Sequence, residues 1–305
     1  MKTKVIPNVI KNHREVRQSE QFASYLANIG WTIENISGWS MFIRTFPLIG
    51  SIVKAQRIPY PFPFEKIIYL RKKYRAYKTI IEVNHPAENS SPIVQTLLQL
   101  GYKKSVDPHA PSKTIHIDLS KSEDVLFGNF TEAKRRGVRR ALNHGIAVEQ
   151  SHDIDAFVSL KWGKDPIFSF LIRKDHRALW KNFSPNNARI LFAYKKITTH
   201  NTQHKTYNNV RAPQPVAGIL LLFYDHVAYY WQAAATREGK KFFAPTLLVW
   251  EALKLAKKKN CVLFDFEGVA DERFPKASKH WHGFTKFKEG FGGTPYSYME
   301  PFIYP

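Results

Sequence analysis

Hydrophobic positions recur along the chain at two spacings, one typical of helices and one typical of strands. Phe22, Leu26 and Ile29 lie three or four positions apart, which predicts a helix over residues 19–29. Short apolar runs and a basic segment follow, with Pro and Gly residues between them. In the first third we therefore expect strands at 39–46, 50–57 and 79–83, and helices at 65–77 and 93–100.

A proline-rich stretch, residues 107–112, has no apolar period and predicts two domains, 1–110 and 111–305, with the active cleft between them. Beyond it, residues 114–119 alternate as a strand. Ser120 and Glu123 match a capping box that would begin one long helix ending at Asn143. We expect further strands at 146–150, 188–194, 216–223, 226–231 and 262–266, helices at 153–162, 174–183 and 246–259, and an exposed loop at 198–213.

The order of these elements after residue 111 matches an acyltransferase fold of the GNAT type, a mostly antiparallel sheet with helices on both faces. A chain of 305 residues is long enough for two such domains, and the first third has a similar but shorter order of elements. The predicted class is therefore α/β (α+β). We expect tandem GNAT-like domains with mixed, mostly antiparallel sheets flanked by helices, the first domain being reduced.

The formal charge of +21 narrows the choice of partners. It favours a polyanion such as tRNA, an anionic membrane surface or a diphosphate-bearing substrate, the alternative being lysines that serve solubility alone. The single cysteine, Cys261, and the lack of an apolar run of roughly 20 residues fit a cytoplasmic protein. Within one predicted helix, five cations in seven positions predict an exposed basic ridge, formed by Lys134, Arg135, Arg136, Arg139 and Arg140.

Four stretches resemble sequence motifs of the FemABX family, and together they span about residues 110–295. The fourth, the run FKEGFGG, is the most specific, and the second combines an aromatic strand with a small-residue turn. In chain order the motifs are the strand 114–119 with the basic helix residues 134–141, then 229–235, 264–269 and 287–293.

The resemblance implies tandem GNAT-like domains and a defined reaction. Family members transfer an amino acid from aminoacyl-tRNA to an amine of a peptidoglycan precursor peptide, which forms cell-wall cross-bridges. The acceptor hangs from a diphosphate that is lipid-linked or nucleotide-linked. We accordingly expect no cofactor and no metal, a monomer, and a cytoplasmic location with peripheral contact at the inner membrane face.

Aminolysis of an ester develops a negative oxygen, which a fixed cation stabilises in a dry cleft. The resemblance gives this role to Lys288, so Lys288→Met should cut turnover about a hundred- to a thousand-fold while folding stays nearly intact. Asp265 and Glu267 are candidates for taking the acceptor proton. We expect at most one of them to point into the cleft, the alternative being structural ion pairs. Substrate binding is predicted for Phe287, Tyr230, Gln232, Lys164 and Phe168, and binding of tRNA phosphate for the basic ridge.

Three positions depart from the family pattern and leave the acceptor's identity open. Lys164 stands where an arginine is usual and cannot make a bidentate fork, and Gln232 replaces an expected tyrosine. In the first domain, the expected acidic position near residues 84–86 is not acidic. The first alternative is an acyl-CoA-dependent GNAT N-acyltransferase. However, residues 237–245 offer one glycine and a proline where CoA enzymes present backbone N–H groups to the diphosphate. The second alternative is a non-catalytic protein that binds tRNA or an anionic membrane.

Overall fold

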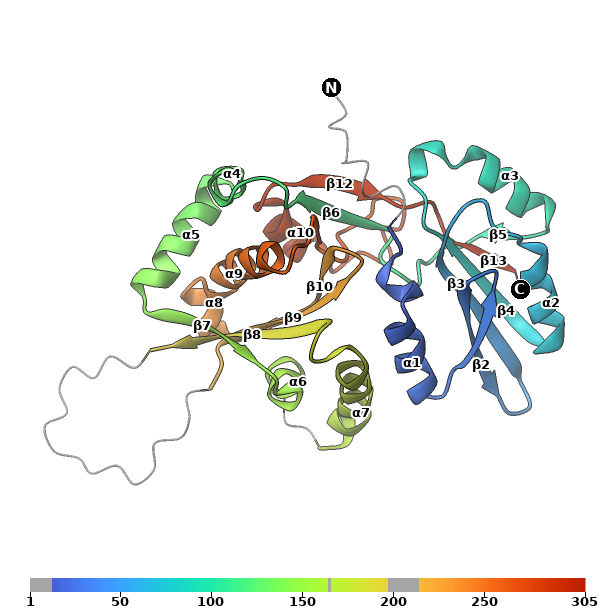
Figure 1. The fold of residues 1–305 in the computed structure, drawn as a ribbon, viewed down its shortest axis with the longest axis horizontal. Helices are drawn as coiled ribbons and strands as arrows, with labels where there is room; N and C mark the ends of the chain where they lie inside the picture. Colours follow the sequence, from blue (N-terminus) through green and yellow to red (C-terminus); the bar gives the residue numbers. More distant parts are fainter. Residues whose placement is uncertain (1–12, 164–165, 197–213, 305) are drawn as a thin grey trace, which may run out of the picture.

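The computed structural model describes residues 13–163, 166–196 and 214–304, without the side chains of 166–170. The predicted loop 198–213, Lys164 and the side chain of Phe168 therefore lie outside the described residues. The described chain forms two lobes, each built on one mixed sheet (Figure 1). Within these ranges, the length and hydropathy that a membrane-crossing helix requires are met by none of the helices.

The first lobe is a six-stranded sheet in the order β1-β2-β3-β4-β13-β5. In this sheet β3 and β4 run parallel, and the other neighbouring strands are antiparallel. Alternate strand residues such as Ile43 and Val53 share one core with Ile67 and Leu70. The elements are η2 (Val16–Gln18), α1 (Glu20–Asn28), β1 (Thr32–Ile36), β2 (Trp39–Phe46), β3 (Gly50–Ile58), α2 (Glu65–Lys73), β4 (Ala76–Val83), η3 (Ala87–Asn89), α3 (Ser91–Gln99), β5 (Lys103–Lys104) and β13 (Phe302–Tyr304).

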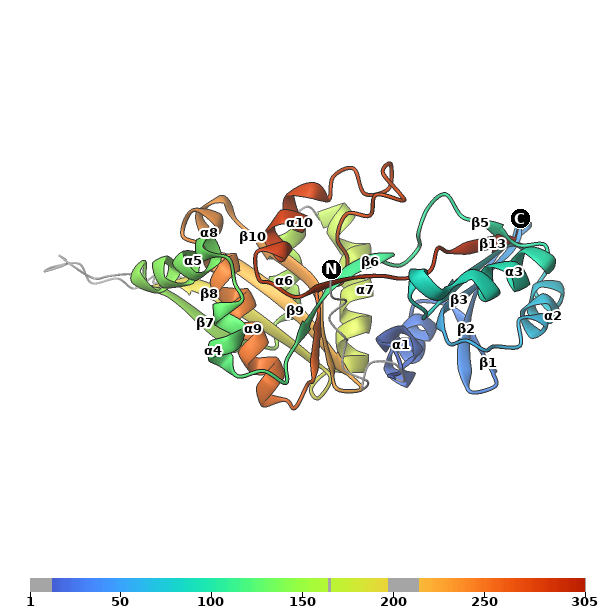
Figure 2. The same cartoon turned by 90° about the horizontal axis from the view of Figure 1, so that it is seen from above.

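The second lobe is a seven-stranded sheet in the order β12-β6-β11-β10-β9-β8-β7, in which β10 and β11 run parallel. Helices cover both faces, with α5 and α9 on one and α6 and α7 on the other (Figures 1 and 2). The elements are β6 (Lys113–Asp118), α4 (Glu123–Gly128), α5 (Glu132–Asn143), β7 (Ile146–Ser151), α6 (Ile154–Trp162), α7 (Pro166–Phe183), β8 (Ala188–Lys195), β9 (Ala217–Tyr224), β10 (Val227–Ala235), α8 (Arg237–Lys241), α9 (Ala244–Lys258), β11 (Leu263–Asp265), α10 (His282–Glu289) and β12 (Thr294–Ser297).

Two sheets of this kind confirm the predicted fold class. Each is mixed and mostly antiparallel, each contains a parallel pair, and each is flanked by helices. The first lobe is also the smaller, because it has fewer strands and carries α1, α2 and α3 against the seven helices from α4 to α10 in the described part of the second.

The predicted division between residues 110 and 111 does not include the return of the chain to the first lobe at its last described strand. Strand β13 leaves the second lobe and lies between β4 and β5, where Ile303 pairs with Ile80 on one side and Lys103 on the other. The last described strand thus belongs to the first sheet and not to a domain 111–305. Three residues are too few for apolar alternation to reveal a strand, and a distant partner leaves no local signal.

The single long helix predicted up to Asn143 is two helices. Ser122 caps α4, because its hydroxyl accepts the Val125 N–H at 3.3 Å. Ser120 instead donates its hydroxyl to Asp118 at 2.6 Å, so the predicted capping box does not form. The chain then turns at residues 129–131 before α5 begins, which changes the direction of the basic residues that follow.

Helix α1 joins the two lobes (Figures 1 and 2). Phe22 packs edge-to-face on Phe42 of β2 and on Trp231 of β10, with ring centroids 5.9 and 6.1 Å apart. On the same helix, the Tyr25 hydroxyl donates to Asp175 of α7 at 2.8 Å. One small helix therefore contacts both sheets, and its burial ties their relative position to the fold.

Candidate active site

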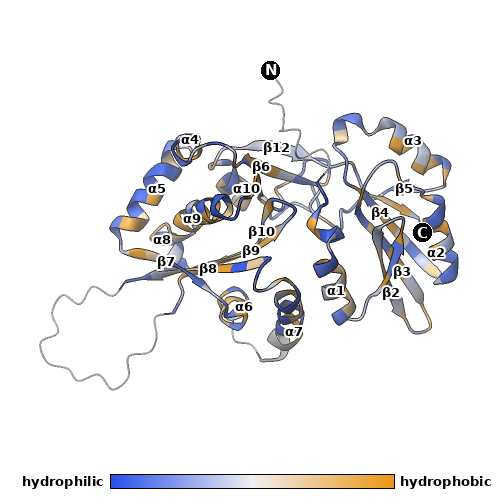
Figure 3. Cartoon of the chain, viewed as in Figure 1, coloured by the Kyte–Doolittle hydropathy of each residue, from blue (hydrophilic) through white to orange (hydrophobic). Residues whose placement is uncertain are grey.

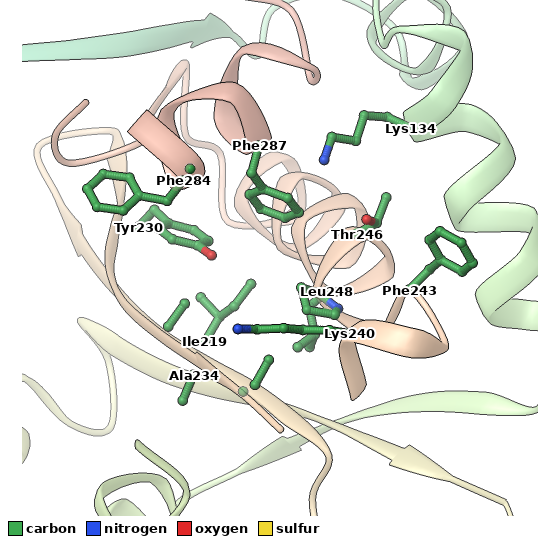
Figure 4. A pocket seen from close by; sticks show the side chains of 15 residues that line it. Lys134, Ile219, Tyr230, Ala234, Lys240, Phe243, Thr246, Leu248, Phe284 and Phe287 are labelled. Carbon is green, nitrogen blue, oxygen red and sulfur yellow. The ribbon is translucent and has the colours of Figure 1, made fainter. Parts of the chain in front are cut away.

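A cavity of about 540 Å³ opens inside the second lobe (Figure 4). It lies between β10, the start of α9, and helices α5 and α10, whereas the active cleft was expected between the lobes. A smaller cavity, about 200 Å³, lies between residues 108–112 and 271–281. The larger cavity is lined by Lys134, Gly218, Ile219, Tyr230, Ala233, Ala234, Ala235, Lys240, Phe243, Pro245, Thr246, Leu248, Gly283, Phe284 and Phe287.

A β-bulge in β10 decides which side chains face this cavity. Tyr230 pairs with Leu221 and Gln232 with Leu220, so Trp231 is an extra residue without its own partner on β9. The predicted small-residue turn is part of the same strand, which continues to Ala235. The three alanines line the cavity and keep this wall open, because a methyl group takes little space.

Gln232 does not line the cavity. Its side-chain oxygen lies 2.8 Å from Nε2 of His176, which is buried on α7. The Gln232 amide therefore has a structural role, because it anchors α7 to the sheet. Its role in substrate binding stays a prediction.

Tyr230 and Phe287 both line the cavity wall (Figure 4). The Tyr230 ring packs on Phe266 with centroids 5.6 Å apart, and its hydroxyl points toward the cavity. Burial raises the pKa of this phenol, so it stays protonated and can donate a hydrogen bond. Phe287 is backed by Phe291 at 5.1 Å. Both residues were predicted as substrate-binding, and both lie where a ligand in this cavity would touch them.

Lys134 faces the cavity and not the exterior. Its ammonium group lies 3.7 Å from the centroid of the Phe287 ring and 4.9 Å from that of Phe291. Its stem crosses Gly290, where a Cβ would come within 2.6 Å of the lysine Cε, so the glycine allows this close approach. Burial lowers the pKa of Lys134 to about 8.

Lys240 supplies a second cation. Its side chain is exposed at the rim, and its ammonium group points into the cavity (Figure 4). Acidic side chains do not occur among the described lining residues. The cavity therefore favours a ligand that is partly apolar and partly anionic.

The start of α9 is poorly suited to bind a CoA diphosphate, as the sequence indicated. Pro245 has no N–H, and the Thr246 N–H donates to the Phe243 carbonyl at 2.9 Å. Of the first three helical residues, at most Ala244 has an N–H available for a phosphate. A diphosphate cradle needs several such groups.

Lys288 lies in the last turn of α10 and not in the glycine-rich turn after it. Its ammonium group donates to the carbonyls of Phe266 at 2.8 Å and Gly268 at 2.6 Å, and the side chain is buried. It contacts the rings of Phe284 and Tyr230, at 4.8 and 5.4 Å, but does not line the cavity. Burial lowers its pKa to about 8.

Asp265 is buried in a polar network and does not line the cavity. It accepts hydrogen bonds from the Thr114 hydroxyl at 2.5 Å and the Glu267 N–H at 2.7 Å, and it lies 3.2 Å from Nε2 of His116. Burial opposes ionisation, but His116, Thr114 and the Glu267 N–H together lower the pKa of Asp265 to about 2.

Glu267 follows the end of β11 with a positive φ of 52° and pairs with Arg17 of the first lobe at 2.8 Å. Burial raises its pKa, and Arg17 opposes that shift. Neither Asp265 nor Glu267 lines the cavity, and both are held in ion pairs, which is the structural alternative that the sequence left open. Their role in taking the acceptor proton stays a prediction.

The predicted basic ridge is smaller than five cations. Lys134 turns inward, and Arg135 donates to the carbonyls of Gly128, at 2.9 Å, and Phe130, which closes the turn between α4 and α5. Three arginines stay exposed on the hydrophilic outer face of α5 (Figure 3). They are Arg136, which pairs with Glu132 at 2.9 Å, Arg139 and Arg140.

Sequence reasoning missed Lys161 and Lys240. Lys161 is half-buried in the last turn of α6. Burial lowers its pKa to about 8, and its charge also acts to lower the pKa of Lys288. Lys240 lies in the segment examined only as a CoA loop. Both are single lysines among many, and their spacing in the sequence does not distinguish them.

Residues 181–305 match the FemAB family, which confirms the resemblance indicated by the motifs. The solved structure of FemX is 18% identical, with a TM-score of 0.74, and the match covers 97% of this chain and 94% of that chain. L-PGS from Bacillus licheniformis is 11% identical, with a TM-score of 0.56 and coverage of 92% and 86%. A tandem GNAT protein from the clavulanic acid biosynthesis pathway is 12% identical, with a TM-score of 0.53 and coverage of 88% and 80%.

At these identities the structures establish the shared fold, and the FemAB match supports an acyltransferase. A comparison with proteins of curated function finds no match.

Proposed function

We propose, on the premise of the FemAB match over residues 181–305, that this chain moves an amino acid from aminoacyl-tRNA to an amine of a peptidoglycan precursor peptide. In this reaction the amine forms an amide bond to the aminoacyl carbon and the ester bond to the tRNA ribose breaks. The attacking amine loses one proton and the departing ribose oxygen gains one, so the step balances. The two lobes would act as one cytoplasmic enzyme at the inner membrane face.

The convergence of the four motif stretches on one cavity carries the proposal. The first stretch contributes Lys134, the second Tyr230 and the third Phe266, which backs the Tyr230 ring. The fourth contributes Phe287. Sequence segments up to about 150 positions apart thus build one site, and a volume of about 540 Å³ is typical of small-ligand sites.

The cavity would receive the aminoacyl end of the tRNA. Its apolar wall suits a small amino-acid side chain, and Lys134 and Lys240 offset negative charge on a phosphate or on the tetrahedral oxygen. The Tyr230 phenol, which burial keeps protonated, can donate to the same oxygen. The exposed Arg136, Arg139 and Arg140 on α5 would hold more distant tRNA phosphates.

Lys288 enters the proposal as a positioning residue. Its two hydrogen bonds fix the carbonyls of Phe266 and Gly268, and Phe266 in turn supports Tyr230. Asp265 and Glu267 hold the same turn from its other side through Thr114 and Arg17. Lys164 and Phe168 remain predicted contacts of the acceptor and its diphosphate.

A transfer assay tests this function. Purified full-length protein is given labelled aminoacyl-tRNA or labelled acyl-CoA, each with a lipid-linked or a nucleotide-linked precursor peptide. We expect the label to enter the peptide when aminoacyl-tRNA is the donor and not when acyl-CoA is the donor. Transfer from CoA thioester without tRNA would instead favour the N-acyltransferase alternative. Binding of tRNA without transfer to either acceptor would favour the non-catalytic alternative.

A further inference from the structure

The tip of the β2–β3 hairpin, residues 46–50, exposes bulky apolar side chains. Leu48 is 108% exposed and Ile49 is 67% exposed, and among the described residues Leu48 is the most exposed large hydrophobic side chain. The Ile49 N–H donates to the Phe46 carbonyl at 3.3 Å, so the tip is a closed turn and not a frayed end. Removing these two side chains from water against a partner surface would therefore be favourable.

The chain around this tip is strongly basic. Between Asn35 and Ile81 the only acidic residue is Glu65. The end of α2 lies beside the hairpin, because the Ser51 hydroxyl donates to the Tyr74 carbonyl at 2.6 Å. The cations of this stretch are Arg44, Lys54, Arg57, Lys66, Arg71, Lys72, Lys73, Arg75 and Lys78.

Two of these cations are exposed next to the tip. Lys72 is exposed in the last turn of α2, and Arg75 is exposed just after it. The Arg75 carbonyl accepts the Ser51 N–H at 3.3 Å, which places this residue at the base of the hairpin. Apolar and cationic side chains therefore lie together at one end of the first sheet.

We propose that the β2–β3 hairpin tip inserts into the surface of an anionic lipid bilayer. Leu48 and Ile49 would enter between the headgroups, while Lys72 and Arg75 would meet lipid phosphates. A protein partner fits less well, because a stable interface buries roughly 800 Å² on each side and two side chains on a convex tip offer far less. The surface is distinct from the arginines of α5, and the proposal does not depend on the transfer reaction.

Vesicle sedimentation of the full-length protein tests the proposal without tRNA or acceptor. We expect binding to phosphatidylglycerol–phosphatidylcholine vesicles, weak binding to phosphatidylcholine alone, and a loss of binding as salt increases. The double variant Leu48→Ser/Ile49→Ser should bind about tenfold or more weakly, since two apolar side chains no longer leave water. Val106→Ser, which changes an 82% exposed residue elsewhere in the chain, is the matched control and should bind as the parent does.

Insertion itself is read from a fluorophore at the tip. The single native cysteine, Cys261, is buried, and burial raises its thiol pKa to about 11, so a thiol-reactive dye should label Leu48→Cys selectively. Emission from an environment-sensitive dye at position 48 should shift to the blue with anionic vesicles. The same dye on Val106→Cys should not shift.

Three results would overturn the proposal. These are equal binding to neutral and anionic vesicles, unchanged emission at position 48, and unchanged binding by a hairpin variant whose melting curve matches the parent's. If Arg139→Glu/Arg140→Glu abolishes vesicle binding while the hairpin variant keeps it, the lipid surface is α5 and not the hairpin.

Discussion

The ammonium group of Lys134 lies 3.7 Å from the centroid of the Phe287 ring, which joins the first and fourth motif stretches at the cavity wall. This contact depends on Gly290, because any Cβ there would meet the lysine stem at 2.6 Å. A cation over an aromatic face is attracted to the ring electrons. The pair therefore holds a positive charge at the cavity wall in a fixed position.

Loss of the Lys134 charge should lower the rate of transfer at high pH. Burial lowers its pKa to about 8, so the charge is present below that pH and is lost as the pH rises through it. We expect Lys134→Met to lower single-turnover transfer by about a hundredfold, the order found for one lost electrostatic donor. Lys134→Arg should stay active to higher pH than the parent, because a guanidinium remains charged. A pH profile identical to the parent's in Lys134→Arg would exclude this role.

Lys288→Met should lower the stability of the protein, whereas the sequence predicted nearly intact folding. The change leaves the buried carbonyls of Phe266 and Gly268 without this donor, and each unpaired group costs about 1–3 kcal/mol. Urea unfolding should therefore show a lower free energy of unfolding. Transfer should fall as well, because the turn behind Tyr230 moves. Parent-like stability together with parent-like turnover would show that this lysine positions nothing.

Arg139 and Arg140 should set the salt dependence of tRNA binding. Each phosphate contact that is lost reduces the slope of log affinity against log salt by about one. Arg139→Glu/Arg140→Glu should thus bind tRNA more weakly and with a flatter slope. Glu132→Gln is a control that changes charge on the same helix and should strengthen binding slightly. Arg135→Glu is unsuitable, because Arg135 closes the turn between α4 and α5.

Lys161 should destabilise the protein at neutral pH. Burial lowers its pKa from 10.5 to about 8, so between these values the unfolded chain binds more protons than the folded one, and stability contributed at this site rises with pH. We expect Lys161→Met to raise the melting temperature at pH 7. The gain should shrink as the pH approaches 10.5, where the lysine is neutral in both states. Melting curves at both pH values give the comparison, and an equal gain at both would rule out the titration.

Local patterns predicted much of the fold and of the motif geometry. The helix expected at 65–77 is α2 at Glu65–Lys73, and the strand expected at 50–57 is β3 at Gly50–Ile58. Tyr230 and Phe287, named from motif resemblance, do line one cavity. In each case the signal lies in neighbouring residues, which the sequence contains directly.

Other features depend on partners far along the chain. The side-chain direction of Lys134 is set by Gly290 and Phe287, so the five cations of residues 134–140 looked alike in the sequence. The two hydrogen bonds of Lys288 go to backbone carbonyls, which have no residue-specific signal. The bulge at Trp231, which turns Gln232 toward His176, likewise follows from pairing with β9.

Strand β13 has a consequence for synthesis on the ribosome. Strand β5 pairs with β13 in the described sheet, and β4 meets β13 along its outer edge, so both lack this partner until residues 302–304 have been made. Most of the first lobe is translated early but is completed after the whole second lobe has emerged. During that interval the unpaired edge of β4 is open to other nascent chains. Synthesis of residues 302–304, and not translation of the first hundred residues, is then the event that allows the first sheet to close.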